Sequence, residues 1–475
     1  TRHLLEDADG RVWVATAAGV GRFDGSRFET ILTTQDGLPT NEIRHMLEAR
    51  DGSLWLATGD YALTGSGLGL VRIDREGAKT WTVADGLGHD FVAGIAQDAA
   101  GDIWLATAAG LTRIHDDETT TFTTEHGLPQ NRLSGLLIDE DDIWVTGQGI
   151  TRFRDDRFTT FTVADGLPVE YWFPSVLDGA GRKWFGGSGS LSRLDESEFR
   201  HFTATDGLAS AEILALEAGS ENELWLATST GVSRFDGQIF QSLHRRDGLP
   251  HHEARDLLVD RQGTVWIATK AGVARYRPRT SPLTLHLSDV IADRGYGPVD
   301  HLSLPPEQRF LAFELSTDRL AHRSRAIVYR YRLTGHDPGW RQTRETRIEY
   351  RDLWSGSFTF EVEAIDRDFN RSSIVRVQVE AMPAWYSDSS RFVPFLFLLL
   401  TLGGGAAFVI RRGIVQRVEA AALRRRQLAR VRVREAVWKM QSADDIEEVL
   451  RSVATGMQEL DIPFDFFGVN VLTSD

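Results

Sequence analysis

The chain has 475 residues, too many for one ordinary domain, and it contains no cysteine, so disulfides cannot stabilise it. The net charge of −15 hides an asymmetry, because residues 411–440 carry nine Arg and one Lys against two Glu, which leaves about −23 on the remainder. An acidic body with one basic segment argues against nucleic acid as its partner. Thr1 is not a start methionine and Asp475 directly follows a strand-like run, so we expect this sequence to be part of a longer protein.

A tryptophan-centred segment recurs through the first 280 residues. The first copy is Val12-Trp13-Val14-Ala15-Thr16, and the seven tryptophans step by 42, 49, 40, 40, 41 and 41 residues. A second marker, Asp-Gly-Leu-Pro or a close variant, keeps the same spacing. Each unit reads as four short strands, which at a period near 40 is typical of a β-propeller blade. Residues 1–280 are therefore predicted to form a seven-bladed β-propeller.

The seventh copy ends early. It stops at Tyr276, where Pro278 and Pro282 follow, and it has no Asp-Gly-Leu-Pro of its own. We expect the last blade to lack its closing strand, with that strand located before Thr1. The recurring Trp and Phe residues are interpreted as packing between blades, and the Asp-Gly pairs as turn formers.

Function in such a scaffold is expected on loops at one face. The turn after the fourth strand and the turn between the second and third strands share a face, which also receives one long insertion, Gly59 to Gly67. Trp172 aligns with buried positions and has a second interpretation as a core residue. The candidate ligand-binding residues are Asp60, Tyr61, His89, Asp90, Asn131, Arg132, Glu170, Tyr171, Trp172, His251 and His252.

The candidates suggest stacking rather than metal chemistry. Tyr171-Trp172-Phe173 places rigid aromatic rings near a polar rim, which suits a sugar ring or an aromatic ligand. Adjacent His251 and His252 point to opposite sides of a strand and are a weak metal signal. No phosphate loop, nucleophile elbow or zinc signature is present, so we expect no catalytic residue, metal or cofactor.

Residues 281–385 lack the repeat and read as six or seven short strands, which predicts a β-sandwich. Tyr329-Arg330-Tyr331-Arg332-Leu333-Thr334-Gly335, followed by Trp340 and then Gly356-Ser357-Phe358-Thr359-Phe360, resembles the triple-tyrosine domain, an immunoglobulin-like module. In bacterial sensors this module follows two-component regulator propeller repeats, which the Trp and Asp-Gly-Leu-Pro copies resemble. The best-studied members carry two propellers, whereas this chain shows one.

Residues 391–412 are predicted to span a membrane, because Phe392 to Ile410 holds 19 uncharged residues, close to the ~20 that a spanning helix needs. The basic residues follow the span, so the positive-inside rule predicts residues 1–390 outside and 411–475 in the cytoplasm of a bacterial inner membrane. Residues 413–441 are predicted as a cytoplasmic signalling helix. Residues 442–475 are predicted to contain an amphipathic helix, with Ser442 as its candidate N-cap, followed by a strand. This segment resembles the truncated start of a GAF domain.

The resemblance implies a transmembrane two-component sensor, most often a histidine kinase acting by phosphorelay. The implied partners are an extracellular ligand (oligosaccharides in many relatives), a second copy of the chain and a cytoplasmic response regulator reached through an output domain after Asp475. Two alternatives stay open. One is a propeller enzyme of lyase type that would use His89, His251, His252 or Glu253, and the other is a platform for protein interaction.

Overall fold

The computed structural model describes residues 1–59, 67–195, 198–208, 212–219, 223–306, 308–318, 327–382, 389–439 and 445–462. Its contacts divide the chain into two units, which are described separately. The first contains Thr1–Leu302, Arg309–Leu353 and Ser357–Glu380, and the second contains the remaining segments with Ala381–Asp475. The predicted candidates Asp60 and Tyr61 lie outside the described residues.

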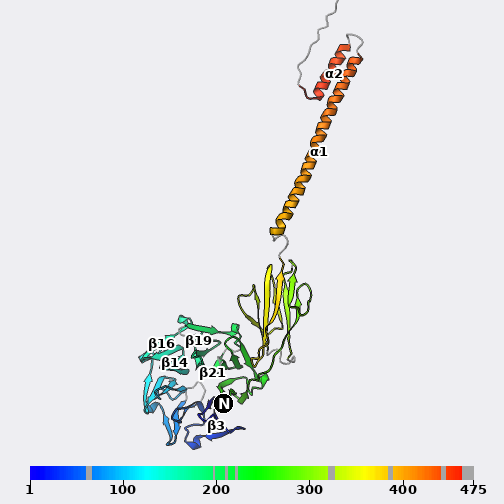
Figure 1. The fold of residues 1–475 in the computed structure, drawn as a ribbon. Coiled ribbons are helices and arrows are strands. Elements are labelled where there is room, and N and C mark those ends of the chain that lie inside the picture. The colour runs from blue at the N-terminus through cyan, green and yellow to red at the C-terminus, as the bar shows by residue number, and fades with distance from the viewer. Residues whose placement is uncertain are drawn as a thin grey trace, which may run out of the picture. The chain divides into compact units, whose positions relative to one another are not determined.

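The tryptophan repeat folds into seven antiparallel sheets, six of them with four strands (Figure 1). Blades 1 to 3 contain β1 (His3–Glu6), β2 (Val12–Thr16), β3 (Gly19–Phe23), β4 (Phe28–Leu32); β5 (Ile43–Glu48), β6 (Leu54–Gly59), β7 (Gly67–Asp74), β8 (Gly77–Trp81); and β9 (Val92–Gln97), β10 (Ile103–Thr107), β11 (Gly110–His115), β12 (Glu118–Phe122). Blades 4 to 6 contain β13 (Gly135–Asp139), β14 (Asp142–Gly147), β15 (Gly149–Arg154), β16 (Arg157–Phe161); β17 (Trp172–Leu177), β18 (Lys183–Gly187), β19 (Leu191–Asp195), β20 (Glu198–Phe202); and β21 (Ile213–Ala218), β22 (Leu224–Thr228), β23 (Gly231–Phe235), β24 (Phe240–Leu243).

The seventh sheet, in the described part of the chain, contains β25 (Ala254–Val259), β26 (Val265–Thr269) and β27 (Gly272–Tyr276). The first strands of the blades contact one another in sequence, from β1 through β5, β9, β13, β17, β21 and β25, and β25 contacts β1 again. The seven-bladed propeller is thereby confirmed. The origin of a closing strand for blade 7 stays a prediction.

Each repeated tryptophan lies opposite an arginine on the third strand, as in the pairs Trp13–Arg22 and Trp225–Arg234. In all seven blades this guanidinium lies 5.1–5.9 Å from the indole centroid, within the range of a cation–π contact. In five blades the indole also meets an aromatic ring of the next blade, and Trp266 of blade 7 meets Phe23 of blade 1 with ring centroids 4.9 Å apart. The predicted role of the tryptophans in packing between blades is therefore confirmed.

The Asp-Gly-Leu-Pro marker forms a short 3₁₀ helix between blades. In the turn after β16, Asp165 Oδ2 accepts hydrogen bonds from the backbone N–H and hydroxyl of Thr162, at 2.9 and 2.8 Å. Gly166 follows with φ of 100°, a conformation that glycine adopts without strain. The six helices are η1 (Thr34–Asp36), η2 (Val83–Asp85), η3 (Thr124–His126), η4 (Val163–Asp165), η5 (Ala204–Asp206) and η6 (Arg245–Asp247).

The second module is a β-sandwich, as predicted. One sheet has the order β28-β30-β33 and the other β29-β35-β34-β31-β32. Phe313 and Phe360 stack between the sheets with centroids 3.6 Å apart, and Tyr329 and Tyr350 are buried beside them. The strands are β28 (Leu285–Ile291), β29 (His301–Leu304), β30 (Leu311–Thr317), β31 (Val328–Thr334), β32 (Arg341–Thr343), β33 (Arg347–Tyr350), β34 (Gly356–Ile365) and β35 (Val375–Ala381).

The second unit contains two helices, α1 (Ser389–Trp438) and α2 (Ile446–Glu459). The apolar run and the basic segment belong to one continuous helix, α1, and this helix is the one in the described residues that is long and apolar enough to cross a membrane. Helix α2 packs on the end of α1, where Arg432 pairs with Glu459 at 2.6 Å. Ser442 and the strand expected after Pro463 lie outside the described residues, so the GAF-like start stays a prediction.

Candidate functional site

Two predicted loop residues are engaged in the turns that carry them. The side-chain oxygens Asp90 Oδ1 and Asn131 Oδ1 accept the first N–H of the preceding 3₁₀ helix, from Val83 and Thr124 respectively, each at 2.7 Å. Asn41 makes the same bond to Thr34. The polar character of this position therefore has a structural cause, since the first N–H groups of a helix need acceptors.

The predicted histidines divide into bonded and exposed side chains. His89 Nδ1 accepts the N–H of Phe91 at 2.9 Å, and His251 Nδ1 accepts the N–H of Glu253 at 3.0 Å. Burial lowers the pKa of His251, and its ring stacks on His252 with centroids 4.1 Å apart. His252 is exposed.

The predicted segment from Glu170 to Trp172 has one buried and two exposed residues. Glu170 accepts a hydrogen bond from the side-chain amide of Gln148, and Tyr171 beside it is 52% exposed. Trp172 is completely buried and its Nε1 donates to the carbonyl of Val169 at 3.1 Å. Trp172 therefore has no surface to offer a ligand, whereas Tyr171 and the exposed Arg132 do.

Sequence reasoning missed a group of titratable residues on the first strands, here named the inner-strand cluster: His3 of β1, His45 of β5 and Asp256 of β25. The rings of His3 and His45 lie 4.0 Å apart, and His3 Nε2 lies 3.9 Å from Asp256 Oδ2. Asp256 also accepts the N–H of Leu4 at 2.7 Å, which joins blade 7 to blade 1. The cluster thus connects three consecutive blades across the ring closure.

Burial sets the protonation of the cluster. It lowers the pKa of His3 to about 4 and, with the nearby charges of His3 and Arg44, lowers the pKa of His45 well below its usual range. Burial raises the pKa of Asp256 to about 7, against the opposing effect of the N–H groups of Leu4 and Leu257. Neutral pH therefore leaves two uncharged imidazoles beside a carboxyl group that is only partly ionised.

Two buried nitrogens in the cluster lack partners. Nδ1 of His3 and Nδ1 of His45 make no hydrogen bond to any described residue. Glu217 on β21 extends the group, because burial raises its pKa to about 8 and it accepts the N–H of Val259 at 3.2 Å. The arrangement offers hydrogen-bonding groups without fixed charge. No group of three or more metal-binding side chains is present among the residues that the structure covers.

An alignment on the tryptophans would have revealed the cluster. Its members stand ten residues before Trp13, Trp55 and Trp266. The residues ten before the tryptophan in the other four blades are small or apolar: Gly94, Ser134, Pro174 and Ala215. The signal is a departure from the repeat at a strand position, whereas the predicted sites were departures in loops.

The propeller and the sandwich meet at residues 366–371, here named the junction loop. Arg371 Nη2 pairs with Asp236 at 2.6 Å and Arg367 Nη1 with Asp247 at 2.8 Å. The buried amide of Gln241 donates to the carbonyls of Ile365 and Asp366 at 3.1 and 3.2 Å.

The junction also has an apolar part. Ile239 of the propeller packs with Val328 and Ile365 of the sandwich, and all three are buried. Buried apolar contact and paired charges together fix the loop to blade 6.

Comparison with known families gives two matches along the chain. Residues 37–60 and 248–271 match the two component regulator propeller, and residues 322–380 match the Y_Y_Y domain. These matches agree with the resemblance found in the repeat and in the tyrosine segment. No match was found among curated protein sequences.

Solved structures include similar folds. One is described as the extracellular domain of the hybrid two component system BT3049 from B. thetaiotaomicron. It matches with a TM-score of 0.54 and 17% identity, over 80% of this chain and 55% of that one. A second, BT4673 from the same organism, has a TM-score of 0.49 and 19% identity over 81% and 57%. The chain therefore spans just over half the length of these structures, and the likeness to BT3049 shows the fold.

Proposed function

We propose that this chain, which carries two-component regulator propeller repeats and a Y_Y_Y domain, is the sensing part of a membrane-spanning signal transducer. The observation that carries the proposal is the junction loop, which fixes the propeller to the sandwich through ion pairs and buried contacts. The sandwich is followed in the chain by a helix able to cross a membrane. A change in the propeller therefore has a physical route toward the span.

In the proposed topology, residues 1–390 lie in the periplasm of a bacterium and residues 411–475 in its cytoplasm. The basic residues after the apolar run support this orientation, because Lys and Arg accumulate on the cytoplasmic side. We propose that the chain acts as a homodimer and passes its signal by phosphorelay to a response regulator, through an output domain beyond Asp475.

The proposed ligand is an extracellular molecule, with a glycan as the leading class. Exposed Tyr171 next to Glu170 supports this choice, since an aromatic face with a polar neighbour suits a sugar ring. The neutral imidazoles and the partly protonated carboxyl group of the inner-strand cluster also suit a hydroxyl-rich ligand.

Topology can be tested directly because the chain has no native cysteine. Arg157→Cys places a thiol on an exposed propeller strand, and Gln427→Cys places one on the basic part of α1. A membrane-impermeant maleimide applied to spheroplasts is expected to label the first variant and to reach the second only after permeabilisation. The reverse pattern would contradict the proposed orientation.

Ligand binding can be tested with the full chain in detergent against a panel of oligosaccharides. A ligand at 100 times its Kd adds about 2.7 kcal/mol to the free energy of unfolding, so the thermal transition should rise clearly. The variant Tyr171→Ala is expected to lose this rise for the bound glycan, with Val163→Ala, another exposed propeller residue, as the control. No rise with any glycan would favour a protein ligand.

The junction can be tested separately. Arg371→Ala removes the ion pairs to Asp236 and Glu363, whereas Arg376→Ala removes only the pair with Glu361 inside the sandwich. Calorimetry of the full chain is expected to show the propeller and sandwich transitions moving apart in the first variant and not in the second. Equal behaviour of the two variants would argue against the junction as the route.

A further inference from the structure

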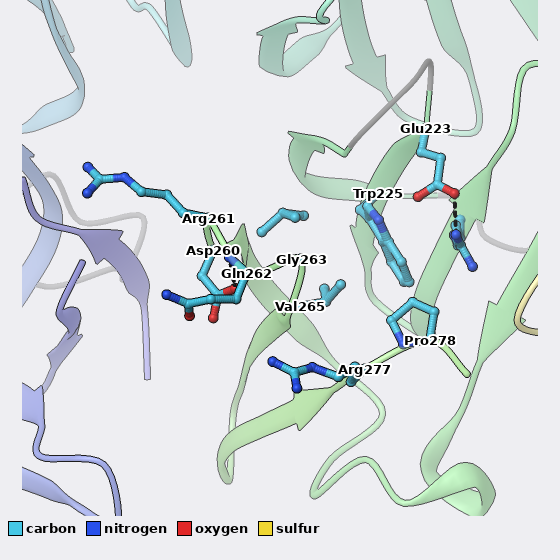
Figure 2. Close-up of a pocket in the computed structure, with 11 residues that line it drawn as sticks. Glu223, Trp225, Asp260, Arg261, Gln262, Gly263, Val265, Arg277 and Pro278 are labelled. Atoms are coloured by element: carbon cyan, nitrogen blue, oxygen red, sulfur yellow. Dashed lines mark hydrogen bonds and ion pairs between the residues drawn. The ribbon is translucent and has the colours of Figure 1, made fainter. Parts of the chain in front are cut away.

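A pocket of about 450 Å³ lies between blades 6 and 7, where the chain leaves β27 (Figure 2). Trp225 and Glu223 belong to blade 6, and Gln262 belongs to the hairpin between β25 and β26. Arg277 and Pro278 directly follow β27 and form another wall of the pocket, which lies below Trp225 and Gln262 in Figure 2. The volume is within the range of small-molecule sites.

Both carboxylates of the pocket already have partners. Asp260 accepts the N–H groups of Gln262 and Thr264 at 3.0 and 2.8 Å, and the indole N–H of Trp266 at 2.8 Å. Glu223 pairs with Arg234 Nη2, the contact drawn as a dashed line in Figure 2. The acidic groups are therefore committed to the protein.

The guanidinium groups, in contrast, are only partly satisfied. Arg277 is exposed and bonds the hydroxyl of Thr264 at 2.9 Å, and it forms no ion pair with any described residue. The guanidinium of Arg261 donates to the carbonyls of Ala8 and Asp7 and likewise has no carboxylate partner in the described part of the chain. The pocket thus holds an excess of positive charge.

Arg234 supplies a second, independent indication. Its side chain is more than nine-tenths buried, and its Nη atoms bond Glu223 and the carbonyl of Asp368. Its Nε is buried without a hydrogen-bond partner among the described residues. An unsatisfied buried N–H is costly, so the guanidinium of Arg234, which lines the pocket, keeps hydrogen-bonding capacity that its protein partners leave unused.

Comparison of the blades shows how Arg277 differs from the residues at the equivalent position. It stands two residues after Arg275, the arginine opposite Trp266. The equivalent residue is an aspartate in blades 1, 2, 5 and 6, namely Asp24, Asp74, Asp195 and Asp236. In those blades the aspartate begins the hairpin to the fourth strand, as Asp24 does by accepting the N–H of Ser26. In blades 3 and 4 the equivalent residues are His115 and Arg154, which pair with Asp102 and Asp142 of their own blades. Blade 7 also carries a basic residue here, but Arg277 lines the pocket and forms no ion pair with a described residue.

We infer that the pocket between blades 6 and 7 binds a small organic carboxylate, held by the guanidinium groups of Arg277 and Arg234. Guanidinium groups bind carboxylates and phosphates in forked geometry. The apolar walls formed by Val259, Val265 and Pro278 favour an anion with a carbon skeleton over inorganic phosphate, which would lose hydration there without compensation.

The pocket also bears on signalling, a link that rests on the proposed sensor function. Arg234 donates to the carbonyl of Asp368 at 3.1 Å and lies 4.4 Å from the ring centroid of Phe369, both in the junction loop. A ligand held by Arg234 would therefore act on the contact between propeller and sandwich. Binding itself is measurable whether or not the chain signals.

The test is calorimetric titration of the purified full chain with succinate, D-glucuronate, D-glucose and inorganic phosphate. We expect saturable binding of at least one carboxylate probe and none of glucose. Arg277→Gln should weaken that binding by about tenfold or more, since a charge-assisted bond is lost. Arg279→Gln, an exposed arginine two residues away and outside the pocket, should bind as the unmodified chain does.

The outcomes separate the inference from the sensor proposal. Three outcomes would each overturn the inference: neither carboxylate binds saturably, the two variants weaken carboxylate binding equally, or phosphate alone binds. Hydrogen exchange at the amides of 366–371 provides the signalling readout. Binding without any change in that exchange would leave the pocket standing and contradict the link to the sensor function.

Discussion

Two positions of the repeated blade differ in how far their residue type varies from blade to blade. At the tryptophan position all seven blades carry the same residue, and each indole meets an arginine of its own blade. At the position of the inner-strand cluster, blades 7, 1 and 2 carry Asp256, His3 and His45, and the other blades carry small or apolar residues. A residue that is the same in every blade serves the packing between blades, whereas a position at which a few blades carry a different type of residue has distinct chemistry.

The largest effect on stability is expected at the repeated tryptophans. Trp184 is 1% exposed, donates to Asp178 at 2.7 Å and stacks on Phe202. Trp184→Ala should lower the free energy of unfolding by about 3–5 kcal/mol, because it leaves a cavity and removes one hydrogen bond from Asp178, which keeps its pair with Arg182. Urea denaturation of the full chain measures this loss. Trp354→Ala, at a tryptophan that is 53% exposed, is the control and should cost far less.

Glu217 beside the cluster predicts a pH dependence. Burial raises its folded pKa to about 8 from 4.5, so the stability it contributes is complete below pH 4.5 and is lost as the pH rises through about 8. Glu217→Gln removes this component, so between pH 5 and 8 the variant should lose less stability than the unmodified chain, by at most about 1.4 kcal/mol per pH unit. Parallel curves would show that Glu217 titrates normally.

His3 should show the opposite sign. Its folded pKa is lowered to about 4 from 6.5, so its contribution is complete above pH 6.5 and is lost as the pH falls through about 4. His3→Gln should therefore flatten the acid side of the stability curve, again by at most about 1.4 kcal/mol per pH unit. If Glu217→Gln and His3→Gln both change the same side of the curve of stability against pH, the protonation states given above for these residues are wrong.

The loop turns predict a smaller effect. Asn131→Ala removes the acceptor for the N–H of Thr124 and should cost about 1 kcal/mol, the usual value of a lost cap. Asn131→Asp keeps an acceptor and should restore most of that stability. Thermal unfolding of the three proteins under one condition gives the comparison. A failure of aspartate to restore it would favour a ligand-binding role for the amide.

The smallest effect is expected at Tyr171. Its side chain is 52% exposed, so Tyr171→Ala should change the free energy of unfolding by no more than about 0.5 kcal/mol. Trp172→Ala, one residue later and completely buried, should cost several times more. Similar losses at the two positions would mean that Tyr171 is also part of the packing.

The repeat could be predicted from sequence because each blade buries the same residues at the same spacing. The apolar run in α1 was equally plain. The ligand residues were harder to predict, since polar loop side chains such as Asp90 and Asn131 are needed by the backbone of their own turns. A polar residue in a repeat loop therefore does not by itself indicate binding.

The inner-strand cluster escaped prediction for a different reason. His3, His45 and Asp256 meet only when the ring closes, and no local spacing brings them together. The pocket at Arg277 depends likewise on two blades and on the course of the chain after β27. Sites formed between repeats need a comparison of equivalent positions across all copies.

The contact between blades 7 and 1 also has a consequence for how the chain folds. The bond from Leu4 N–H to Asp256 joins residues 252 positions apart, whereas the hairpins within a blade close over short loops. Contacts of such long sequence separation form late, because the loop-closure entropy must be overcome first. During synthesis the first blade must wait for the seventh, and until then the nascent propeller is an open arc with the packing surfaces of its first and latest blades uncovered.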